Sequence, residues 1–177
     1  MTELNTHTLD VPGVRLTYDV RDPESDSGAP ALLMIGSPMD ARGFGTLAGH
    51  FTDRTVVTYD PRGVARSERT DDATKSTPEQ HADDLHRIVD ELDLGPVDVF
   101  GTSGGAINAL AFVAEHPEQV RTVVAHEPPT VQVLPDREQA SAAVHDIGET
   151  YQRDGMGPGM LVSAMNLPMP GPMPSRS

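Results

Sequence analysis

The feature that most constrains the fold is an alternation of short apolar runs with helical patterns. Four such runs occur, and segments with helical spacing at 78–94 and 104–116 separate the second run from the third and the third from the fourth. Such runs are typical of strands buried on both faces of a sheet. Strands that alternate with helices favour a mostly parallel sheet with helices on both faces, so the sequence predicts an α/β fold. The four runs are 31–36 (ALLMIG), 55–59 (TVVTY), 97–100 (VDVF) and 122–125 (TVVA).

The two ends of the chain depart from this pattern. Residues 6–20 alternate apolar and polar side chains around a Pro12-Gly13 turn, which predicts an N-terminal antiparallel hairpin. Residues 155–177 hold four Gly, five Pro and five Met among 23 residues and no acidic residue. We therefore expect one domain over 1–154, ending in a helix over 136–153, and a disordered tail over 155–177.

Composition excludes several classes of protein. The chain has 27 acidic and 13 basic side chains and a formal net charge of −14, so neither nucleic acid nor a membrane surface is expected as a partner. It has no cysteine, and hence no thiol nucleophile, disulfide or cysteine zinc site. No apolar run approaches the ~20 residues of a membrane-spanning helix, and residues 1–10 do not resemble a signal peptide. We expect a cytoplasmic protein that uses no metal or cofactor.

One turn carries candidate chemistry. Gly101-Thr102-Ser103-Gly104-Gly105 follows the run at 97–100 and precedes a helix, which is G-x-S-x-G in a strand–turn–helix context. Such a tight turn strains the backbone of Ser103 and exposes its hydroxyl at the carboxyl edge of the sheet. Gly101 and Gly105 are required because a Cβ there would collide with the neighbouring strand and helix. The pattern predicts Ser103 as a nucleophile beside the N-terminal amides of a helix.

This turn and three further segments together resemble the α/β-hydrolase family, over residues 6–154 and about the N-terminal two-thirds of such a protein. The resemblance implies that the amides of Ser37 and Gly104 form an oxyanion hole, that Asp60 and Arg62 brace their loop, and that 136–153 begins a cap. A simple turn stays open for Ser37, and turn chemistry with a local ion pair is the favoured interpretation of Asp60 and Arg62. The resemblance also implies cleavage of a small ester, thioester, lactone or amide through an acyl-enzyme on Ser103. The three segments are 35–39 (IGSPM), 60–67 (DPRGVARS, with Ala65 in place of a family glycine) and 123–129 (VVAHEPP).

The family places its catalytic histidine after a later strand than any predicted here. The resemblance therefore implies a chain truncated before that histidine, impaired in catalysis, with an exposed sheet edge through which it could form a homodimer. Glu127 is a candidate acid, because some family members place the acid after this strand, and His126 could approach Ser103. An ordinary loop carboxylate for Glu127 and a structural hydrogen bond for His126 are the favoured interpretations.

Other functions stay open. The chain could be a non-catalytic binding or interaction module on a hydrolase scaffold. A nucleotide-binding domain fits poorly, because the loops lack both G-x-G-x-x-G after the first strand and G-x-x-x-x-G-K-[ST]. A metal site that combines His81 with His86 is disfavoured, because residues five apart do not share a helix face. The identity of the small-molecule substrate is not encoded in any of these motifs.

Overall fold

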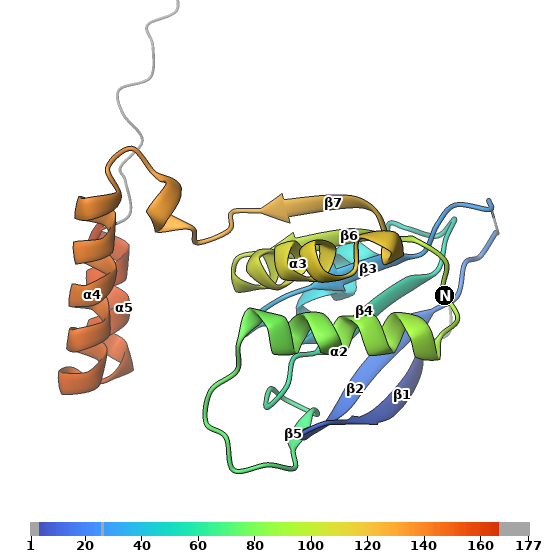
Figure 1. The fold of residues 1–177 in the computed structure, drawn as a ribbon, viewed down its shortest axis with the longest axis horizontal. Coiled ribbons are helices and arrows are strands. Elements are labelled where there is room, and N and C mark those ends of the chain that lie inside the picture. Colours follow the sequence, from blue (N-terminus) through green and yellow to red (C-terminus); the bar gives the residue numbers. More distant parts are fainter. Residues whose placement is uncertain (1–3, 26, 167–177) are drawn as a thin grey trace, which may run out of the picture. The chain divides into compact units, whose positions relative to one another are not determined.

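The computed structural model describes residues 4–25 and 27–166 and divides the chain into two units, one ending at Pro129 and the other beginning at Thr130. In the described part of the first unit, seven strands form one sheet in the order β1-β2-β4-β3-β6-β7, with β5 paired to β2 (Figure 1). The strands β3, β4, β6 and β7 are parallel, whereas β1, β2 and β5 pair antiparallel. This confirms the predicted parallel sheet and N-terminal hairpin. The bounds are β1 Leu4–Val11, β2 Val14–Arg21, β3 Leu32–Ile35, β4 Val56–Asp60, β5 Glu68–Arg69, β6 Val97–Thr102 and β7 Val120–His126.

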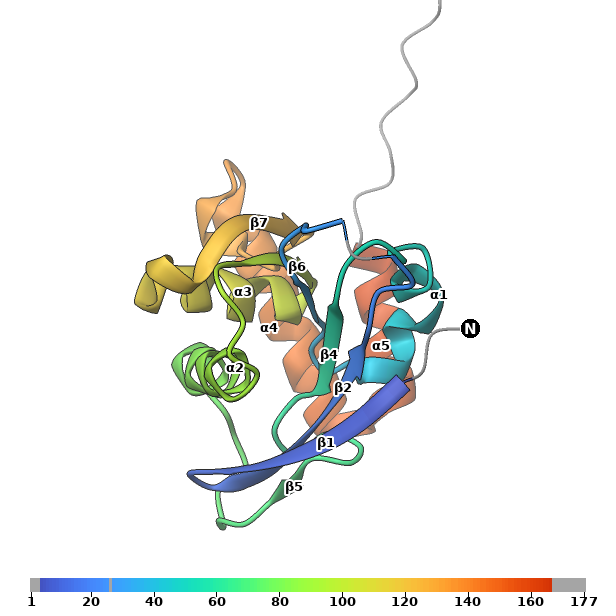
Figure 2. The ribbon, with the colours of Figure 1, turned by 90° about the vertical axis from the view of Figure 1, so that its right-hand side faces the viewer.

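Helices cover both faces of this sheet (Figure 2). On one face, α2 and α3 enclose the larger apolar core with the inward side chains of β2, β3, β4 and β6. On the other face, the short helices η1 and α1 enclose a smaller core with β3 and β4. The expected two-faced architecture is therefore confirmed. The bounds are η1 Ala41–Phe44, α1 Gly45–Ala48, α2 Pro78–Glu91, α3 Gly104–Glu115 and η2 Pro117–Gln119.

The start of α2 follows from its sequence. The Thr77 side chain accepts from the Gln80 amide at 3.3 Å, and the Gln80 side chain accepts from the Thr77 amide at 3.1 Å. Pro78 occupies the first turn, where its missing N–H leaves no intrahelical bond unmade. The helix then buries Ala82, Leu85 and Ile88 completely. A capping box and one apolar stripe are thus enough to form α2 and to orient it on the sheet.

The buried side chain of His81 makes the free energy of unfolding depend on pH. It is 8% exposed, and its buried Nδ1 has no hydrogen-bond partner among the described residues. Burial, reinforced by the positive charges of Arg62 and Arg69, lowers the pKa of His81 from 6.5 to about 4. The folded state therefore favours the neutral ring, and the stability that this provides is complete above the unfolded pKa and is lost as the pH falls toward 4.

We expect this loss to be visible in urea denaturation. Between about pH 7.5 and pH 5, the free energy of unfolding of the natural chain should fall about 2 kcal/mol more than that of His81→Gln. The two proteins share every other titratable group, so the difference between their losses reports His81. Equal losses in the two proteins would contradict a buried, neutral histidine.

The strand β7 differs from the expectation for its sequence. The apolar run at 122–125 predicts a strand buried on both faces, which is wrong: no residue of β7 is buried, and Val124 is 52% exposed. Among the described strands, β7 stands at the end of the order and pairs only with β6. A strand with one neighbour and one uncovered face cannot bury both sets of side chains. Dimerisation through this exposed edge stays a prediction.

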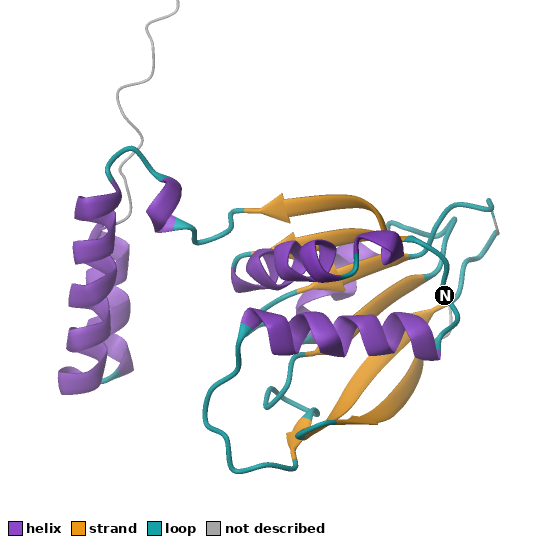
Figure 3. Ribbon diagram, viewed as in Figure 1, coloured by secondary structure: helices purple, strands orange, loops and turns teal. Residues whose placement is uncertain are grey.

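The second unit corrects the expected domain boundary and tail. It contains η3 Val131–Val133, α4 Arg137–Asp154 and α5 Met156–Asn166, and α4 packs along α5 (Figure 3). The helix expected over 136–153 as part of a domain over 1–154 therefore belongs to a unit that begins at Thr130. Within the described residues, no helix is both long enough and apolar enough to cross a membrane.

The disordered tail expected over 155–177 is wrong for the part that α5 occupies. Gly155, with φ 89° and ψ −175°, ends α4 in a positive-φ conformation that glycine adopts readily. Met156, Met160 and Leu161, which follow it, are residues of high helix propensity. Pro158 lies in the first turn of α5, where an amide N–H has no helical partner. The rest of the expected tail, 167–177, lies outside the described residues.

Candidate active site

The backbone turns sharply at Ser103, between β6 and α3. Ser103 has φ 54° and ψ −126°, and Gly104 is the first residue of the helix. The Ser103 amide donates to the carbonyl oxygen of His126 at 2.9 Å, and the Ser103 carbonyl oxygen accepts from the Ala106 amide at 2.9 Å. Both bonds hold the turn in a conformation that L residues rarely adopt. The Ser103 side chain is exposed, so the predicted sharp turn is present and presents its hydroxyl to solvent.

The glycines around Ser103 sit where no larger residue fits. A Cβ built on Gly101 would lie 2.8 Å from the Cβ of Ala109 and 2.9 Å from the Cα of Ala106. A Cβ on Gly105 would collide with the carbonyl oxygen of Ile35 and lie 2.6 Å from its carbonyl carbon. The crossing of β6, α3 and β3 is therefore closer than side chains permit, which is the physical reason for the predicted glycine spacing.

The loop after β3 lies against the turn at Ser103. Strands β3 and β6 are parallel neighbours with Ile35 opposite Gly101, so both carboxyl ends meet at one edge of the sheet. A Cβ built on Gly104 would lie 2.7 Å from the carbonyl oxygen of Ser37. The backbone of Ser37 thus runs directly beside the N-terminus of α3. An oxyanion hole built from the amides of Ser37 and Gly104 needs these two segments to be close, and that role stays a prediction.

His126 is the last residue of β7, and Glu127 follows it at the same edge. His126 lies opposite Thr102 in the strand register, and its Nδ1 is 3.1 Å from the Thr102 hydroxyl oxygen. Within the described residues, its imidazole makes that side-chain bond and none to the hydroxyl of Ser103. Glu127 is exposed, with φ 49°. The structure brings both candidates to the correct edge, and their catalytic roles stay predictions.

A network of charges braces the loop that follows β4. Asp60 is 1% exposed and accepts from the Ala41 amide at 3.0 Å and the Arg66 amide at 3.0 Å. The Arg66 guanidinium contacts Asp60 at 2.7 Å and bridges to Asp19 on β2 at 2.8 Å. Burial alone would raise the pKa of Asp60, but the bonds from Arg66 and Ala41 lower it below its usual value. The ionised Asp60 therefore ties three segments together.

Arg62 makes the second brace. It forms a bidentate ion pair with Asp84 on α2, at 2.8 and 2.6 Å, and both side chains are almost completely buried. The family resemblance implies that Asp60 and Arg62 brace a loop, but no pattern in the sequence indicates Asp84 or Arg66 as their partners. Asp84 lies next to Leu85 on the buried side of α2, and a carboxylate on an apolar stripe was the available signal. Arg66 carried no such signal.

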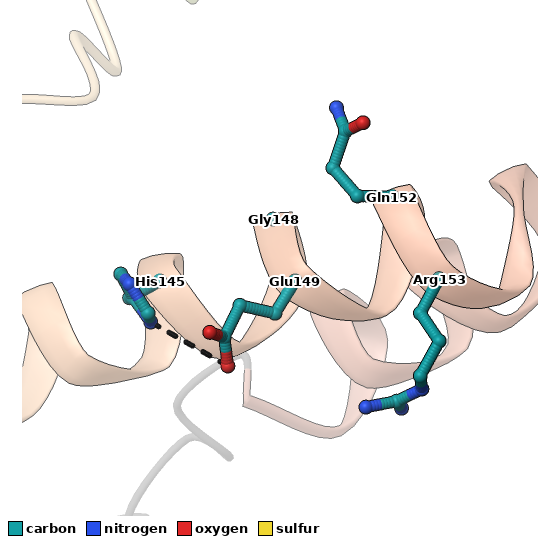
Figure 4. A pocket seen from close by; sticks show the side chains of 5 residues that line it. All are labelled: His145, Gly148, Glu149, Gln152 and Arg153. Atoms are coloured by element: carbon teal, nitrogen blue, oxygen red, sulfur yellow. Dashed lines mark ion pairs between the residues drawn. The ribbon is translucent and has the colours of Figure 1, made fainter.

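A hollow of about 690 Å³ in the second unit contains none of the predicted site residues. Its lining side chains all project from α4, and His145 and Glu149 form an ion pair at 3.8 Å (Figure 4). These residues lie along one surface of a single helix and include no part of the turn between β6 and α3. Among the described residues, no group of three or more His, Asp or Glu side chains is placed to hold a metal ion.

The sheet, the turn at Ser103 and the loop beside it are the framework of one class of enzyme. The family described as the alpha/beta hydrolase fold matches residues 35–162, and the chain belongs to this family. It is 37% identical over 154 residues to the uncharacterized hydrolase YraK of Bacillus subtilis (strain 168). The aligned region covers 85% of this chain and 55% of the relative.

Two further similarities extend this assignment. A proline iminopeptidase of Heyndrickxia coagulans is 30% identical over 124 residues, covering 68% of this chain and 42% of the relative. The crystal structure of a proline iminopeptidase from Mycobacterium smegmatis has the same fold, with a TM-score of 0.66 at 19% identity over 94% of this chain and 64% of that one. The chain spans about half the length of the curated relatives it matches.

Proposed function

We propose that this chain carries the nucleophile and the oxyanion-binding amides of a serine hydrolase that acts on a small ester, thioester, lactone or amide. The observation that carries the proposal is the backbone of Ser103, held at φ 54° and ψ −126° with its side chain exposed at the carboxyl end of β6. Strained conformations of this kind persist where the surrounding structure enforces them, and they cluster at active sites. Membership of a hydrolase family supports the same conclusion.

The proposed chemistry is acyl transfer. The Ser103 Oγ attacks the substrate carbonyl carbon while its proton passes to a base, and the carbonyl oxygen becomes an oxyanion. The amides of Ser37 and Gly104 donate to that oxygen, and the positive end of the α3 dipole adds to them. Collapse of the intermediate releases the alcohol, thiol or amine and leaves an acyl-enzyme. Water then cleaves the acyl-enzyme and releases a carboxylic acid.

Among the described residues, no base is hydrogen-bonded to the Ser103 hydroxyl. The imidazole of His126 is bonded to Thr102, and a serine hydroxyl without a base is a weak nucleophile. We propose that these residues alone support slow acyl transfer, about 10³–10⁴-fold faster than water, from the oxyanion hole and substrate binding. Glu127 is the proposed acid, with the role of orienting a base rather than of taking the serine proton.

Covalent labelling tests this function. We expect a fluorophosphonate probe to form an adduct on Ser103 of the folded chain, located by peptide mass spectrometry. The reaction should be abolished by Ser103→Ala and unchanged by Ser141→Ala, which removes an exposed serine from the regular helix α4. Circular dichroism of all three proteins shows that the fold is kept. Adduct formation spread over other serines, at a rate independent of Ser103, would refute a nucleophile at this turn.

A second function is favoured by one observation. Because the described residues place no histidine on the Ser103 hydroxyl, the fold could serve as a non-catalytic binding or interaction module. In that case the well-folded chain would remain unlabelled by the probe. The two functions therefore predict opposite outcomes in the same experiment.

A further inference from the structure

A cavity of about 270 Å³ lies on the η1 and α1 face of the sheet, away from the turn at Ser103. Its walls come from β1, β2, β4, η1 and α1, and none of its lining residues belongs to β3 or β6. Leu4, Phe44, Ala48 and Val56 form its apolar surface. The volume is close to the lower end of the about 300–1,000 Å³ range of ligand pockets, so it suits a small ligand.

Arg21 is the unusual residue in this cavity. It lies at the end of β2, opposite Leu4 on one side and Val56 on the other, and it lines the cavity. Its Nε is buried and has no hydrogen-bond partner among the described residues. Within the described residues, no carboxylate lies within ion-pair distance of its guanidinium. A buried guanidinium nitrogen with no acceptor is costly, because it has lost water and gained nothing in return.

The other arginines of the first unit show how unusual this is. Each of them pairs with at least one aspartate among the described residues; the pairs include Arg15 with Asp10, Arg42 with Asp40, Arg54 with Asp53, Arg62 with Asp84, Arg66 with Asp19, Arg69 with Asp71, Arg87 with Asp83 and Arg121 with Asp98. In a chain with a net charge of −14, an arginine without a carboxylate is an exception. The missing acceptor would fit a ligand.

The remaining charges of the cavity do not oppose an anion. Asp19 lines the wall, but both its oxygens accept from the Arg66 guanidinium, at 3.0 and 2.8 Å, and Oδ1 also accepts from Thr6 at 2.6 Å. Arg42 is the other charged lining residue, and it is paired with Asp40. With these two neutralised, Arg21 contributes one uncompensated positive charge beside an apolar wall.

We propose that this cavity binds a small carboxylate with a short apolar chain. The carboxylate accepts from the Arg21 guanidinium, and the chain lies against Phe44, Ala48 and Val56. Such an acceptor compensates the positive charge of Arg21, and the apolar wall is removed from water along the rest of the ligand. The site is separate from Ser103, so its occupancy does not depend on catalysis by this chain.

Pentanoate is the probe for this site, titrated into the full 177-residue chain and followed by amide chemical shifts. We expect saturable shifts in η1, α1 and the end of β2, with a dissociation constant of about 1 mM, as befits a ligand of about seven non-hydrogen atoms. The neutral alcohol 1-pentanol should bind about tenfold or more weakly, because it cannot form the charge-assisted bond. Equal affinity for the two compounds, or shifts that do not saturate, would overturn the proposal.

Three variants locate the site. Arg21→Met should weaken pentanoate binding about tenfold or more, whereas Arg15→Met, which removes an exposed arginine from the same strand, should leave it unchanged. Gly45 lines the cavity and has open space where a Cβ would be, so Gly45→Leu should block the ligand while Arg21 remains. Binding that survives either Arg21→Met or Gly45→Leu would place pentanoate elsewhere and refute this site.

Discussion

Gly105→Ala should destabilise the first unit by at least about 3 kcal/mol, the upper part of the range for overpacking a well-packed interior. The added Cβ would collide with the Ile35 carbonyl oxygen and lie 2.6 Å from its carbon and 2.8 Å from the Cα of Gly36. These are backbone atoms of the last residue of β3 and of the residue that follows it, and β3 is hydrogen-bonded to β4 on one side and β6 on the other. Neither strand nor helix can move away without breaking its own bonds, so the cost cannot be relieved by rotating a side chain.

Urea denaturation followed by circular dichroism measures this loss. Gly95→Ala is the matched control, because a Cβ at Gly95 meets no heavy atom within 4 Å, and its effect should stay within about 0.5 kcal/mol. Stability of Gly105→Ala equal to that of Gly95→Ala would show that α3 and β3 are not in contact at this position.

Arg62→Met should cost about 3–5 kcal/mol, because it leaves the Asp84 carboxylate buried without a partner. Asp84 has no exposed surface, and burial raises its pKa although the Arg62 charge opposes this. The exposed pair of Asp83 and Arg87 on the same helix is the control. Arg87→Met should change the free energy of unfolding by less than about 0.5 kcal/mol, because water replaces the lost contact.

A double variant separates the charge from the packing. Arg62→Met combined with Asp84→Leu should recover most of the stability lost in Arg62→Met, because no unpaired charge then remains in the core. If Arg62→Met and Arg87→Met were equally mild in urea denaturation, the Arg62–Asp84 pair would not be buried in solution.

The elements of the first unit were predictable from short stretches of sequence. The runs at 31–36, 55–59 and 97–100 became β3, β4 and β6, because a parallel strand covered on both faces needs apolar residues on both sides. The run at 122–125 has the same local pattern, yet β7 is exposed. No local signal separates a central strand from an edge strand, since the difference is the number of neighbours.

The candidate site was predictable where one turn contains it. The G-x-S-x-G spacing encodes the contacts of Gly101 and Gly105, so the position of Ser103 followed from five residues. The braces were harder, because their partners are distant in the chain: Arg66 and Asp19 are 47 residues apart, and Arg62 and Asp84 are 22 apart. Local patterns report local backbone conformation and do not report pairs of this kind.

By itself, the sequence determined the turn that presents Ser103, the alternation of strands with helices, and the capping of α2. Each of these features depends on residues that are close together in the chain. Tertiary structure decided which strand lies at the edge, where the second unit begins, and which acid meets which arginine. It alone placed Arg21 beside an apolar cavity where no carboxylate of the described residues pairs with it. Those outcomes depend on which segments, distant in the chain, pack against one another. The burial of their side chains supplies the free energy that favours one packing over another.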